Sequence, residues 1–296
     1  MDNSPNFICV GAQKSGTSTL HDILKEHPLL FLPKEKETKF FFDDNEYKKG
    51  KDYYINNYYK GCNNNQISGE VDPEYLYFQK VPKRIFETLG NEVKIIFLLR
   101  NPAYRAYSHY NMSFVRGHEA IPFKEAIILE KERIGKNEFL RNHLSYIDRG
   151  YYSLQIKEYL KYFKKENMFF MIFEDDIIQN QHLSINKLFN FLGVHEINLN
   201  KSKKSNVSFS YKFKFLRDLR YRPNKVFKLI AKILFPDVKD RSRLMNYIER
   251  FNQFPEKTDK LSSKNARYIN NKYFLNDIRE LEILIQRDLD VWLTEK

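Results

Sequence analysis

The chain has 296 residues, of which 42% are hydrophobic and 30% are charged. This composition can bury a core, and it excludes intrinsically disordered, collagen-like and low-complexity proteins. The length predicts a single domain over residues 1–296. Of the net charge of +12, residues 200–250 contribute +11, from 15 basic and 4 acidic residues. Such a block suggests an anionic partner (nucleic acid, a phosphorylated or sulfated ligand, or a membrane surface), with an ordinary solvated surface as the alternative.

The sequence shows no pattern of a disulfide framework, a metal site, a membrane-spanning helix or a signal peptide. The only cysteines are Cys9 and Cys62, and the seven histidines show no metal-ligand spacing. We therefore expect neither a disulfide framework nor a metal site. No apolar run approaches the roughly 20 residues of a membrane-spanning helix, and the N-terminus shows no signal peptide. These features favour a soluble cytoplasmic protein.

Short apolar runs alternate with amphipathic segments along the chain. Three of the apolar runs predict buried parallel strands, at residues 6–10, 94–99 and 168–173. Helical spacing of apolar residues predicts one helix that ends at His27, one that begins at Asn101-Pro102 and runs toward Gly117, and others over residues 153–163, 185–192 and 274–292. This order predicts an α/β fold: a central parallel sheet flanked by helices, with a largely helical C-terminal part.

The loop after the first strand, GAQKSGTSTL at residues 11–20, has the features of an anion-binding site. Backbone N–H groups and the dipole at a helix N-terminus both attract negative charge. Gly11 and Gly16 flank the loop, Lys14 adds a positive charge, and hydroxyl residues occupy positions 17–19. The pattern is not a Walker A loop, because Thr17 stands where that loop has its lysine. An ordinary polar connection is the alternative.

The segment LLRNPAYRAYSHY, residues 98–110, supplies a second candidate site. Arg100 directly follows a buried strand, so we expect it at the edge of the sheet where open α/β proteins bind ligands. Ser108 lies about two turns into the next helix. The two side chains could hold a second phosphate, with the arginine as a bidentate fork. An arginine that only pairs with a nearby carboxylate is the alternative.

A third candidate is Glu37, in the segment PKEKETKFFF at residues 33–42. It precedes Phe40 by three positions, and a carboxylate beside an apolar cluster can have a raised pKa, which suits a general base. The alternative is a solvated, charged turn. Glu35 and His109 are the next candidates for a base.

Taken together, the three segments resemble one family: sulfotransferases that use 3′-phosphoadenosine 5′-phosphosulfate (PAPS), on the heparan-sulfate-type branch and its bacterial relatives. The resemblance rests on QKSGT, a KExxxFF-type segment and LLRNPxxRAYSHY, and it covers most of the chain except about 200–255. It continues through shorter segments: GEVDPEYLY (69–77), FKEAI (123–127), DRGYYSLQIKEYLKYF (148–163), FEDDI (173–177), LFNFLGV (188–194) and LEILIQRDLDVWL (281–293).

The resemblance implies a P-loop-like sulfotransferase fold and a role for each candidate residue. Lys14, Ser15, Gly16, Thr17 and Ser18 would hold the 5′ phosphosulfate of PAPS. Arg100 and Ser108 would hold its 3′ phosphate, also in the product PAP, and no metal is implied. Glu37 would be the catalytic base, and Lys14 would neutralise charge on the departing nucleotide. The acceptor would be a hydroxyl or amine of a carbohydrate or glycolipid.

Differences from the family pattern fall mainly on the acceptor side. Lys39 and Phe42 stand where some relatives have His and Asp, and Val71-Asp72 replaces a Lys-Ser pair found in some heparan enzymes. Two other classes of function stay open. A P-loop-type nucleotide kinase or phosphate-binding module would share the first loop, and a nucleic-acid or membrane-surface binding protein would share the basic block.

The basic block, residues 200–250, predicts a helical insertion or a substrate-side segment. Within it, the apolar residues Val226, Leu229, Ile230, Ile233 and Leu234 fall on one helical face, with Lys225, Lys228 and Lys232 off that face. A basic amphipathic helix can lie on an anionic membrane, so residues 211–235 could contact such a surface at its inner, cytoplasmic face, with no nucleic-acid partner. The alternative is that the apolar face packs on the core. The sequence does not indicate the oligomeric state.

Overall fold

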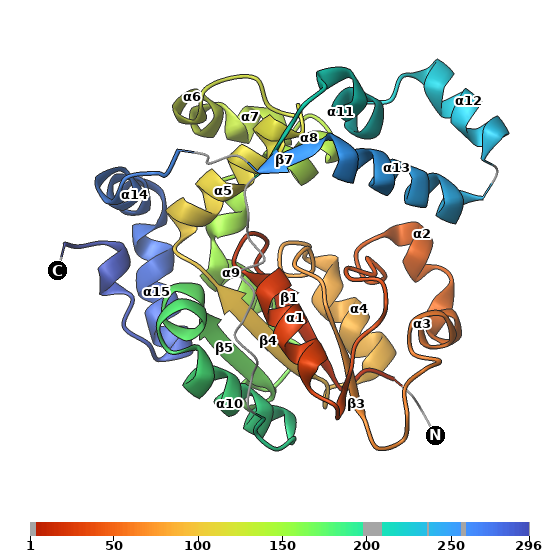
Figure 1. The fold of residues 1–296 in the computed structure, drawn as a ribbon. Helices are drawn as coiled ribbons and strands as arrows, with labels where there is room; N and C mark the ends of the chain where they lie inside the picture. Colours follow the sequence, from red (N-terminus) through yellow and green to blue (C-terminus); the bar gives the residue numbers. More distant parts are fainter. Residues whose placement is uncertain (1–3, 198–208, 236, 256–258, 296) are drawn as a thin grey trace. The chain divides into compact units, whose positions relative to one another are not determined.

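A computed structural model of the protein describes residues 4–197, 209–235, 237–255 and 259–295 (Figure 1). The chain divides into two compact units, each described here by itself. The first unit comprises residues 1–105, 149–206 and 263–296, and the second comprises residues 106–148 and 207–262. The chain passes from the first unit to the second within one helix, α5 (Pro102–Val115). The expectation of a single domain over 1–296 stays a prediction.

The first unit is built on a five-stranded parallel sheet with the order β2-β3-β1-β4-β5. The strands are β1 (Phe7–Gly11), β2 (Leu30–Phe31), β3 (Ile67–Val71), β4 (Lys94–Leu99) and β5 (Met168–Ile172). Strand β1 is central, since Phe7 pairs with Gly69 of β3 on one side and with Lys94 of β4 on the other. The three predicted strands are confirmed. The sequence analysis missed β2, which has two residues, and β3, whose sequence ISGEV is not an apolar run.

Helices cover both faces of this sheet (Figure 1). The helices of the first unit are α1 (Thr17–Glu26), α2 (Asp44–Tyr47), α3 (Gly50–Tyr58), α4 (Lys80–Leu89), α9 (Tyr152–Leu160), α10 (Gln181–Leu192), α14 (Ser263–Ile269) and α15 (Leu275–Ile285). On one face, α1 and α10 pack on apolar side chains of β1, β4 and β5. On the other, Tyr159 of α9 packs edge-on against Phe97 of β4, 5.3 Å between ring centroids. The predicted α/β class is therefore confirmed.

The ends of the helices agree with the sequence in two places and differ in one. Asn101 caps α5, because its Oδ1 accepts from the N–H groups of Ala103 and Tyr104 at 3.1 and 3.3 Å. Gly193 ends α10 in the left-handed conformation. The expectation of one long helix over 274–292 is wrong. Helix α15 ends at Ile285 because Gln286 adopts a left-handed φ of 55°, and a separate short helical turn follows at Asp290–Trp292.

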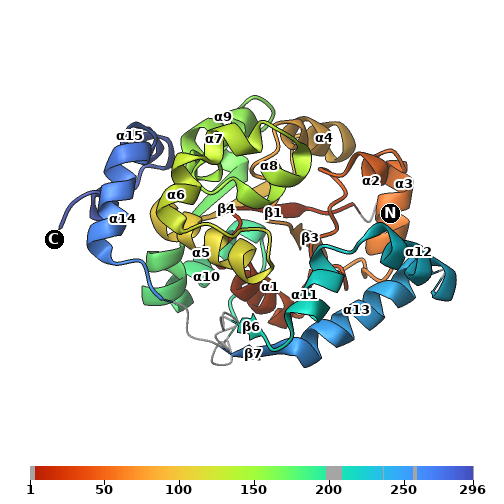
Figure 2. The same cartoon turned by 90° about the horizontal axis from the view of Figure 1, so that it is seen from above.

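The second unit is mostly helical in its described part. It contains the last part of α5 with α6 (Phe123–Ile128), α7 (Glu130–Ile134), α8 (Glu138–Leu144), α11 (Lys214–Tyr221), α12 (Lys225–Leu234), α13 (Val238–Asn252) and the antiparallel strands β6 (Phe209–Tyr211) and β7 (Gln253–Pro255) (Figure 2). Buried Glu119 links α7 to the segment that follows α8, because it ion-pairs with Arg133 at 2.9 Å and accepts from the Tyr146 hydroxyl at 3.0 Å.

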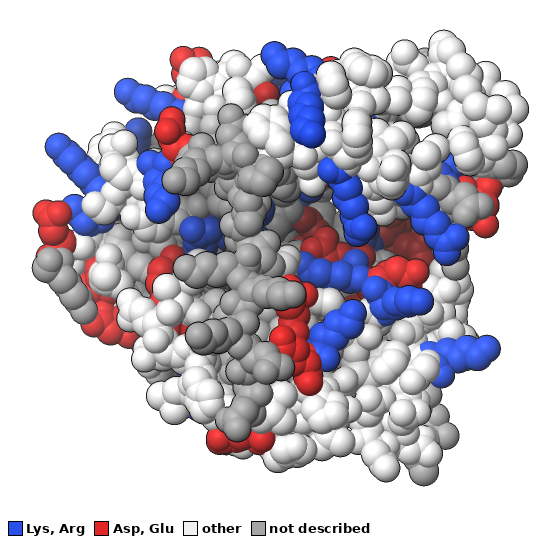
Figure 3. Space-filling model, viewed as in Figure 1, with Lys and Arg blue, Asp and Glu red and all other residues white. Residues whose placement is uncertain are grey.

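Helix α12 presents apolar side chains to solvent. Its exposed members are Val226, Leu229, Ile230, Ile233 and Leu234, each between 46% and 67% exposed. Figure 3 shows the surface over α12, at its upper right, as mostly uncharged. Within the second unit, therefore, this apolar face does not pack on the core as the alternative interpretation expected. The side chains of Lys225 and Lys228 lie outside the described part of the chain, whereas Lys232 is exposed.

Candidate functional site

The loop between β1 and α1 has a fixed backbone and an uncapped helix behind it. The Ala12 N–H donates to the Leu98 carbonyl of β4 at 2.7 Å, and the Ser15 N–H donates to the Ala12 carbonyl at 3.2 Å. Helix α1 has Gly16 as its N-cap, so no side chain caps its first N–H groups, and its first turn has no acidic residue. The start of α1 therefore keeps the attraction for an anion that a helix N-terminus provides.

The two glycines of the loop are required by close contacts. Gly16 has a φ of +92°, and a Cβ at this position would lie 2.5 Å from the Phe173 ring. A Cβ at Gly11 would lie 2.9 Å from the Pro73 carbonyl oxygen. Lys14, half-buried between them, adopts a left-handed φ of 70°. A loop with these restrictions holds a single backbone shape, which favours a fixed binding site over an ordinary polar connection.

Arg100 follows β4 and reaches the same loop. Its Nη1 donates to the Lys14 carbonyl at 3.1 Å, and its guanidinium lies 5.0 Å from the centre of the Phe173 ring. Its Nε is 3.8 Å from Glu174, a loose ion pair. Burial raises the pKa of Glu174, whereas Arg100 acts in the opposite direction. Arg100 therefore contacts the loop as well as Glu174, so it does more than pair with a nearby carboxylate.

Lys36 connects Glu37 with the start of α1. Its Nζ donates to the Ser18 hydroxyl at 2.7 Å and lies 3.2 Å from the Glu37 carboxylate. The Glu37 side chain is 37% exposed, while Phe40 and Phe41 are fully buried. The carboxylate therefore lies outside the aromatic cluster rather than within it, contrary to the environment that the sequence suggested. The structure brings together a carboxylate, a cation and a hydroxyl at the start of α1.

The backbone around Glu37 is held in a strained conformation by buried polar groups. Glu37 and Lys39 have φ values of 62° and 61°, in the left-handed region that non-glycine residues rarely adopt. Between them, the buried Thr38 hydroxyl donates to Glu70 at 2.8 Å. The Lys39 N–H donates to Asp72 at 2.9 Å. Both carboxylates belong to β3 or follow it directly, so the central sheet fixes the backbone that carries Glu37.

The environment of these two carboxylates shifts their protonation. Burial raises the pKa of Glu70 to about 7, and hydrogen bonds from Thr38, Tyr75 and Tyr54 act in the opposite direction. Burial also raises the pKa of Asp72 well above its usual range, and the charge of Glu70 adds to this effect. Because the two groups are close, we expect at least one of them to hold a proton near neutral pH.

A further polar link ties the first loop to the start of α9. The Gln13 amide donates to Glu74, and Glu74 ion-pairs with Arg149 at 2.8 Å. The Arg149 side chain is only 3% exposed, and its guanidinium lies 4.2 Å from the centre of the Tyr77 ring. A buried, ion-paired arginine of this kind contributes fixed positive charge beside the loop.

The first unit gathers most of the predicted site residues, with one exception. Lys14, Ser15, Gly16, Thr17 and Ser18 form the loop and the start of α1, with Arg100 and Glu37 beside them. Ser108 is half-buried on α5, in the part of that helix that belongs to the second unit. Of the reserve candidates, Glu35 is exposed and His109 is fully buried.

Sequence reasoning assigned no role to four residues that build this site. They are Lys36, Glu70, Asp72 and Arg149. All four lie in segments that the sequence analysis quoted: Lys36 in PKEKETKFFF, Glu70 and Asp72 in GEVDPEYLY, and Arg149 in DRGYYSLQIKEYLKYF. The missing signal was the strand β3, because only its pairing with β1 brings Glu70 and Asp72 to the backbone of Thr38 and Lys39.

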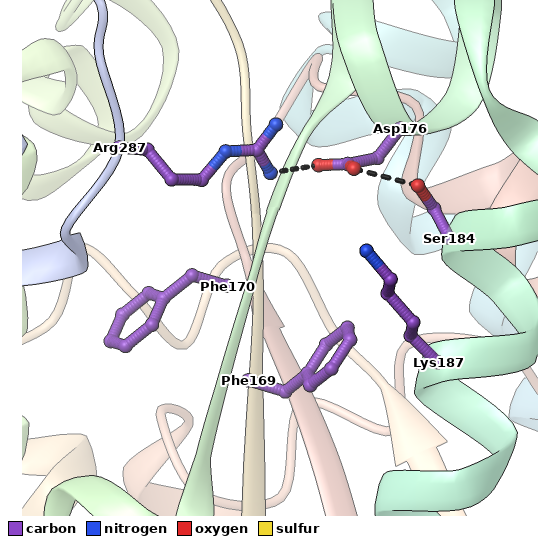
Figure 4. Close-up of a pocket in the computed structure, with 6 residues that line it drawn as sticks. All are labelled: Phe169, Phe170, Asp176, Ser184, Lys187 and Arg287. Carbon is purple, nitrogen blue, oxygen red and sulfur yellow. Dashed lines mark hydrogen bonds and ion pairs between the residues drawn. The ribbon is translucent and has the colours of Figure 1, made fainter.

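A separate cavity of about 420 Å³ lies along β5 in the first unit (Figure 4). Its charged groups already engage one another. Asp176 accepts from the Ser184 hydroxyl at 2.7 Å and pairs with Arg287, which also pairs with Asp175 at 3.0 Å. Asp176 further accepts from the Ile172 N–H at the end of β5. We therefore interpret this cluster as structural, joining β5 to the C-terminal part of the chain.

The described residues contain no metal-binding cluster and no membrane-spanning helix. Among the described residues, no group of three or more His, Cys, Asp or Glu side chains could hold a metal ion. Within the same described part, no helix combines the length and apolar character needed to cross a bilayer.

Comparisons with known proteins agree on one family. A family model described as "Sulfotransferase domain" matches residues 4–263. The membrane-associated sulfotransferase kil1 of Dictyostelium discoideum is 36% identical over 111 residues, 37% of this chain and 23% of that protein. The bifunctional heparan sulfate N-deacetylase/N-sulfotransferase 4 of Mus musculus is 29% identical over 175 residues, 56% of this chain and 20% of that protein.

Two further matches extend the comparison. Heparan sulfate glucosamine 3-O-sulfotransferase 5 of Mus musculus is 29% identical over 163 residues, 55% of this chain and 46% of that protein. The chain thus spans less than half of the length of each of these relatives. The crystal structure of a sulfotransferase from Alicyclobacillus acidocaldarius superposes with a TM-score of 0.67 at 24% identity, over 98% of this chain and 99% of that one. This last likeness shows that the fold is shared.

Proposed function

Because the chain belongs to the sulfotransferase domain family, we propose that it transfers a sulfuryl group from PAPS to a hydroxyl or amine of a carbohydrate or glycolipid. One observation carries the proposal: Lys36 joins the Glu37 carboxylate to the Ser18 hydroxyl at the uncapped start of α1. An anion-binding loop and a carboxylate thereby share one site. This is the pair of groups that transfer from an anionic donor to a hydroxyl requires.

The residues of the first loop fit an anionic donor. Bound PAPS would supply the activated sulfuryl group. Lys14, Ser15, Gly16, Thr17 and Ser18 would hold its 5′ phosphosulfate through N–H groups, hydroxyls and one ammonium group, and Arg100 and Ser108 would hold its 3′ phosphate. The uncapped N-terminus of α1 and the glycine contacts at Gly16 support the fit. No step that we propose calls for a metal.

Glu37 has the contacts of a positioned base. We assign it the proton of the acceptor group, which its partly exposed carboxylate can accept. Lys36 orients this carboxylate, and Glu70 and Asp72 fix the backbone that carries it. Lys14 would offset the negative charge that develops on the nucleotide side of the breaking bond. The strained φ values at Glu37 and Lys39 support a positioning function, because strain is concentrated where geometry matters for activity.

The acceptor class rests on the relatives. Two of them are named for heparan sulfate, which supports a carbohydrate acceptor here. A third is named as membrane-associated. We extend the proposal to a glycolipid acceptor at the inner face of a membrane, with the protein in the cytoplasm, and we assign the basic helices no nucleic-acid partner.

The surface for that contact is residues 211–235. Helix α12 exposes its apolar side chains, and basic residues around it are exposed as well: Lys212, Lys214, Arg222 and Lys232. A helix with an apolar face and basic flanks binds anionic membranes by burial of apolar area and by attraction to acidic headgroups.

The function is tested by supplying PAPS with a labelled sulfuryl group to a panel of glycans, glycolipids and small alcohols. We expect label on a carbohydrate or glycolipid, without added metal. Label on none of the panel, together with phosphoryl transfer from Mg-ATP, would instead favour the kinase alternative. The position of Thr17, where a kinase loop has its lysine, already weighs against that alternative.

A further inference from the structure

The second unit contains a cleft of about 390 Å³ lined by aromatic side chains. Tyr107, Tyr110 and Phe114 come from α5, where their spacing of three and four residues places them on one helical face. The rings of Tyr107 and Tyr110 are 6.1 Å apart and inclined by 19°, and those of Tyr110 and Phe114 are 5.9 Å apart and inclined by 29°. Tyr211 of β6 adds a fourth ring. We call this site the aromatic cleft.

The tyrosine hydroxyls in the aromatic cleft are partly engaged by the unit itself. The Tyr110 hydroxyl donates to the Ile121 carbonyl at 3.0 Å, and the Tyr211 hydroxyl bonds with Glu249 at 3.0 Å. Both rings are therefore fixed, and they contribute carbon surface to the cleft. Phe114, in contrast, is 50% exposed, so its ring is accessible from solvent.

Two cations from α11 complete one side of the cleft. Lys214 and Arg217 are three residues apart and so lie on one face of that helix. Lys214 is exposed and has no ion-pair partner among the described residues. The Arg217 guanidinium pairs with Asp218 at 2.7 Å and lies directly against Gly117, where a Cβ would approach its Cζ to 2.9 Å. Arg217 is thus a fixed planar donor, and Lys214 is a mobile one.

The remaining polar groups in the cleft are short. Asn111 supplies an amide and Ser210 a hydroxyl, while Asp259 places one carboxylate in the lining. Aromatic faces, an amide and a hydroxyl match the C–H and O–H groups of a sugar ring. Lys214 and Arg217 match a carboxylate or sulfate on it, because guanidinium and ammonium groups form charge-assisted hydrogen bonds with such anions.

We propose that the aromatic cleft binds an acidic sugar, a uronate or a sulfated residue, of a glycan chain. The inference rests on the proposed function in one respect: that function favours an acidic glycan as the ligand over another anion, such as a nucleic acid. Stacked rings beside cations also suit single-stranded nucleic acid, which is the competing occupant that the experiment separates. A neutral glycan would give Lys214 no anionic partner and Arg217 none besides Asp218, so the cleft should discriminate against it.

The test uses calorimetry on the full chain with four probes: a heparin hexasaccharide, an alginate hexasaccharide, maltohexaose and oligothymidylate. We compare the wild type with the double variant Phe114→Ala/Lys214→Gln. The matched control is Phe86→Ala/Lys124→Gln, which changes an exposed phenylalanine of α4 and an exposed lysine of α6 that lie outside the cleft. Thermal unfolding of all three proteins verifies that they are folded.

The expected result is that the wild type and the control bind at least one acidic hexasaccharide and bind maltohexaose much more weakly. The Phe114→Ala/Lys214→Gln variant should bind the acidic probe about tenfold or more weakly, from the loss of a charge-assisted contact and a ring face. Equal binding by that variant overturns the proposal. Binding of neither acidic hexasaccharide by the wild type, or binding of oligothymidylate in their place, also overturns it.

PAP binding and labelled transfer, measured on the same proteins, separate the two proposals. If the acidic probe binds at the cleft but no sulfuryl transfer occurs on any acceptor, only the proposed function fails. If transfer occurs and the cleft variant binds the acidic probe as the wild type does, only the inference about the cleft fails.

Discussion

Positive charge is used differently in the two units of this protein. In the first unit, the cations at the candidate site are engaged at short range: Lys36 with Ser18 and Glu37, Arg100 with the Lys14 carbonyl, and Arg149 with Glu74. In the second unit, Lys212, Lys214, Arg222 and Lys232 are exposed, as are the apolar side chains of α12. The same residue types thus form a fixed site in one unit and an accessible surface in the other.

The difference indicates which unit should tolerate change. Engaged groups lose contacts when a partner is removed, since a buried polar group without a partner is costly. Exposed cations act by summed charge, so single changes should matter little and salt should matter more.

Replacing the proposed base should have the largest effect. Glu37→Gln keeps the shape of the side chain but removes its ability to accept a proton, so we expect transfer to fall by on the order of 10²-fold or more. PAP binding should be unchanged, because the loop and Arg100 are untouched. Steady-state transfer and calorimetry with PAP measure both. Glu26→Gln, at an exposed position at the end of α1, is the control. Near-normal turnover by Glu37→Gln would remove the role from this residue.

The buried carboxylate of Glu70 should make stability depend on pH. Its pKa is raised by burial from 4.5 to about 7. Between these values the folded protein keeps a proton that the unfolded chain has lost, so the free energy of unfolding falls as pH rises through this window. The contribution of Glu70 is roughly 3 kcal/mol. Denaturant unfolding at pH 5 and pH 7.5 measures it.

Glu70→Gln should lose that part of the pH dependence. Asp72 shifts in the same direction and remains in the variant, so some dependence should persist. If the free energy of unfolding depends on pH in the same way in the wild type and in Glu70→Gln, Glu70 is not the buried, titrating group beside Thr38.

Removing the guanidinium of Arg100 should weaken PAP binding. The loss of a charge-assisted contact predicts a cost of about 1.5–3 kcal/mol for Arg100→Ala. Calorimetry with PAP measures the change, and Arg279→Ala, which removes an exposed arginine paired with Glu282 and Asp290, serves as the control. Equal affinity of Arg100→Ala and the wild type would mean that Arg100 only supports the loop backbone.

Substitutions on the surface of α12 should have the smallest effect on sulfuryl transfer and a clear effect on membrane binding. Leu229→Gln/Ile233→Gln replaces two exposed apolar side chains, so we expect weaker co-sedimentation with vesicles that contain phosphatidylserine. PAP binding should not change. Changing Lys225, Lys228 and Lys232 together to Gln should reduce the salt sensitivity of the same binding. If neither variant differs from the wild type on these vesicles, residues 211–235 do not form a membrane surface.

The sequence predicted the strands that are continuous apolar runs and the helices whose ends are marked by capping residues. Residues 94–99 form β4 as predicted, and Asn101 and Gly193 mark their helix ends. It did not predict β3, because Ser68, Gly69 and Glu70 interrupt its apolar pattern while tertiary packing buries them. The break at Gln286 was also missed, because the apolar spacing continues past it to Leu289 and Trp292.

The candidate site was predictable where the chemistry is local in sequence and not where it depends on sheet pairing. The prediction of an anion-binding loop rests on residues 11–18 alone. The positions of Glu70 and Asp72 under Thr38 and Lys39 follow from contacts between residues more than 30 positions apart. The family resemblance is confirmed by the match over residues 4–263, whereas the role of each residue stays a prediction.

The most direct test of the proposed sulfuryl donor compares the binding of two nucleotides at the loop formed by residues 11–18. Calorimetry with PAP in the presence of a chelator, and separately with Mg-ATP, reads the donor preference of the wild-type protein. We predict that PAP binds without metal and that Mg-ATP binds far more weakly, because Thr17 follows Gly16 where a Walker A sequence has lysine. Tight binding of Mg-ATP together with no binding of PAP would contradict it.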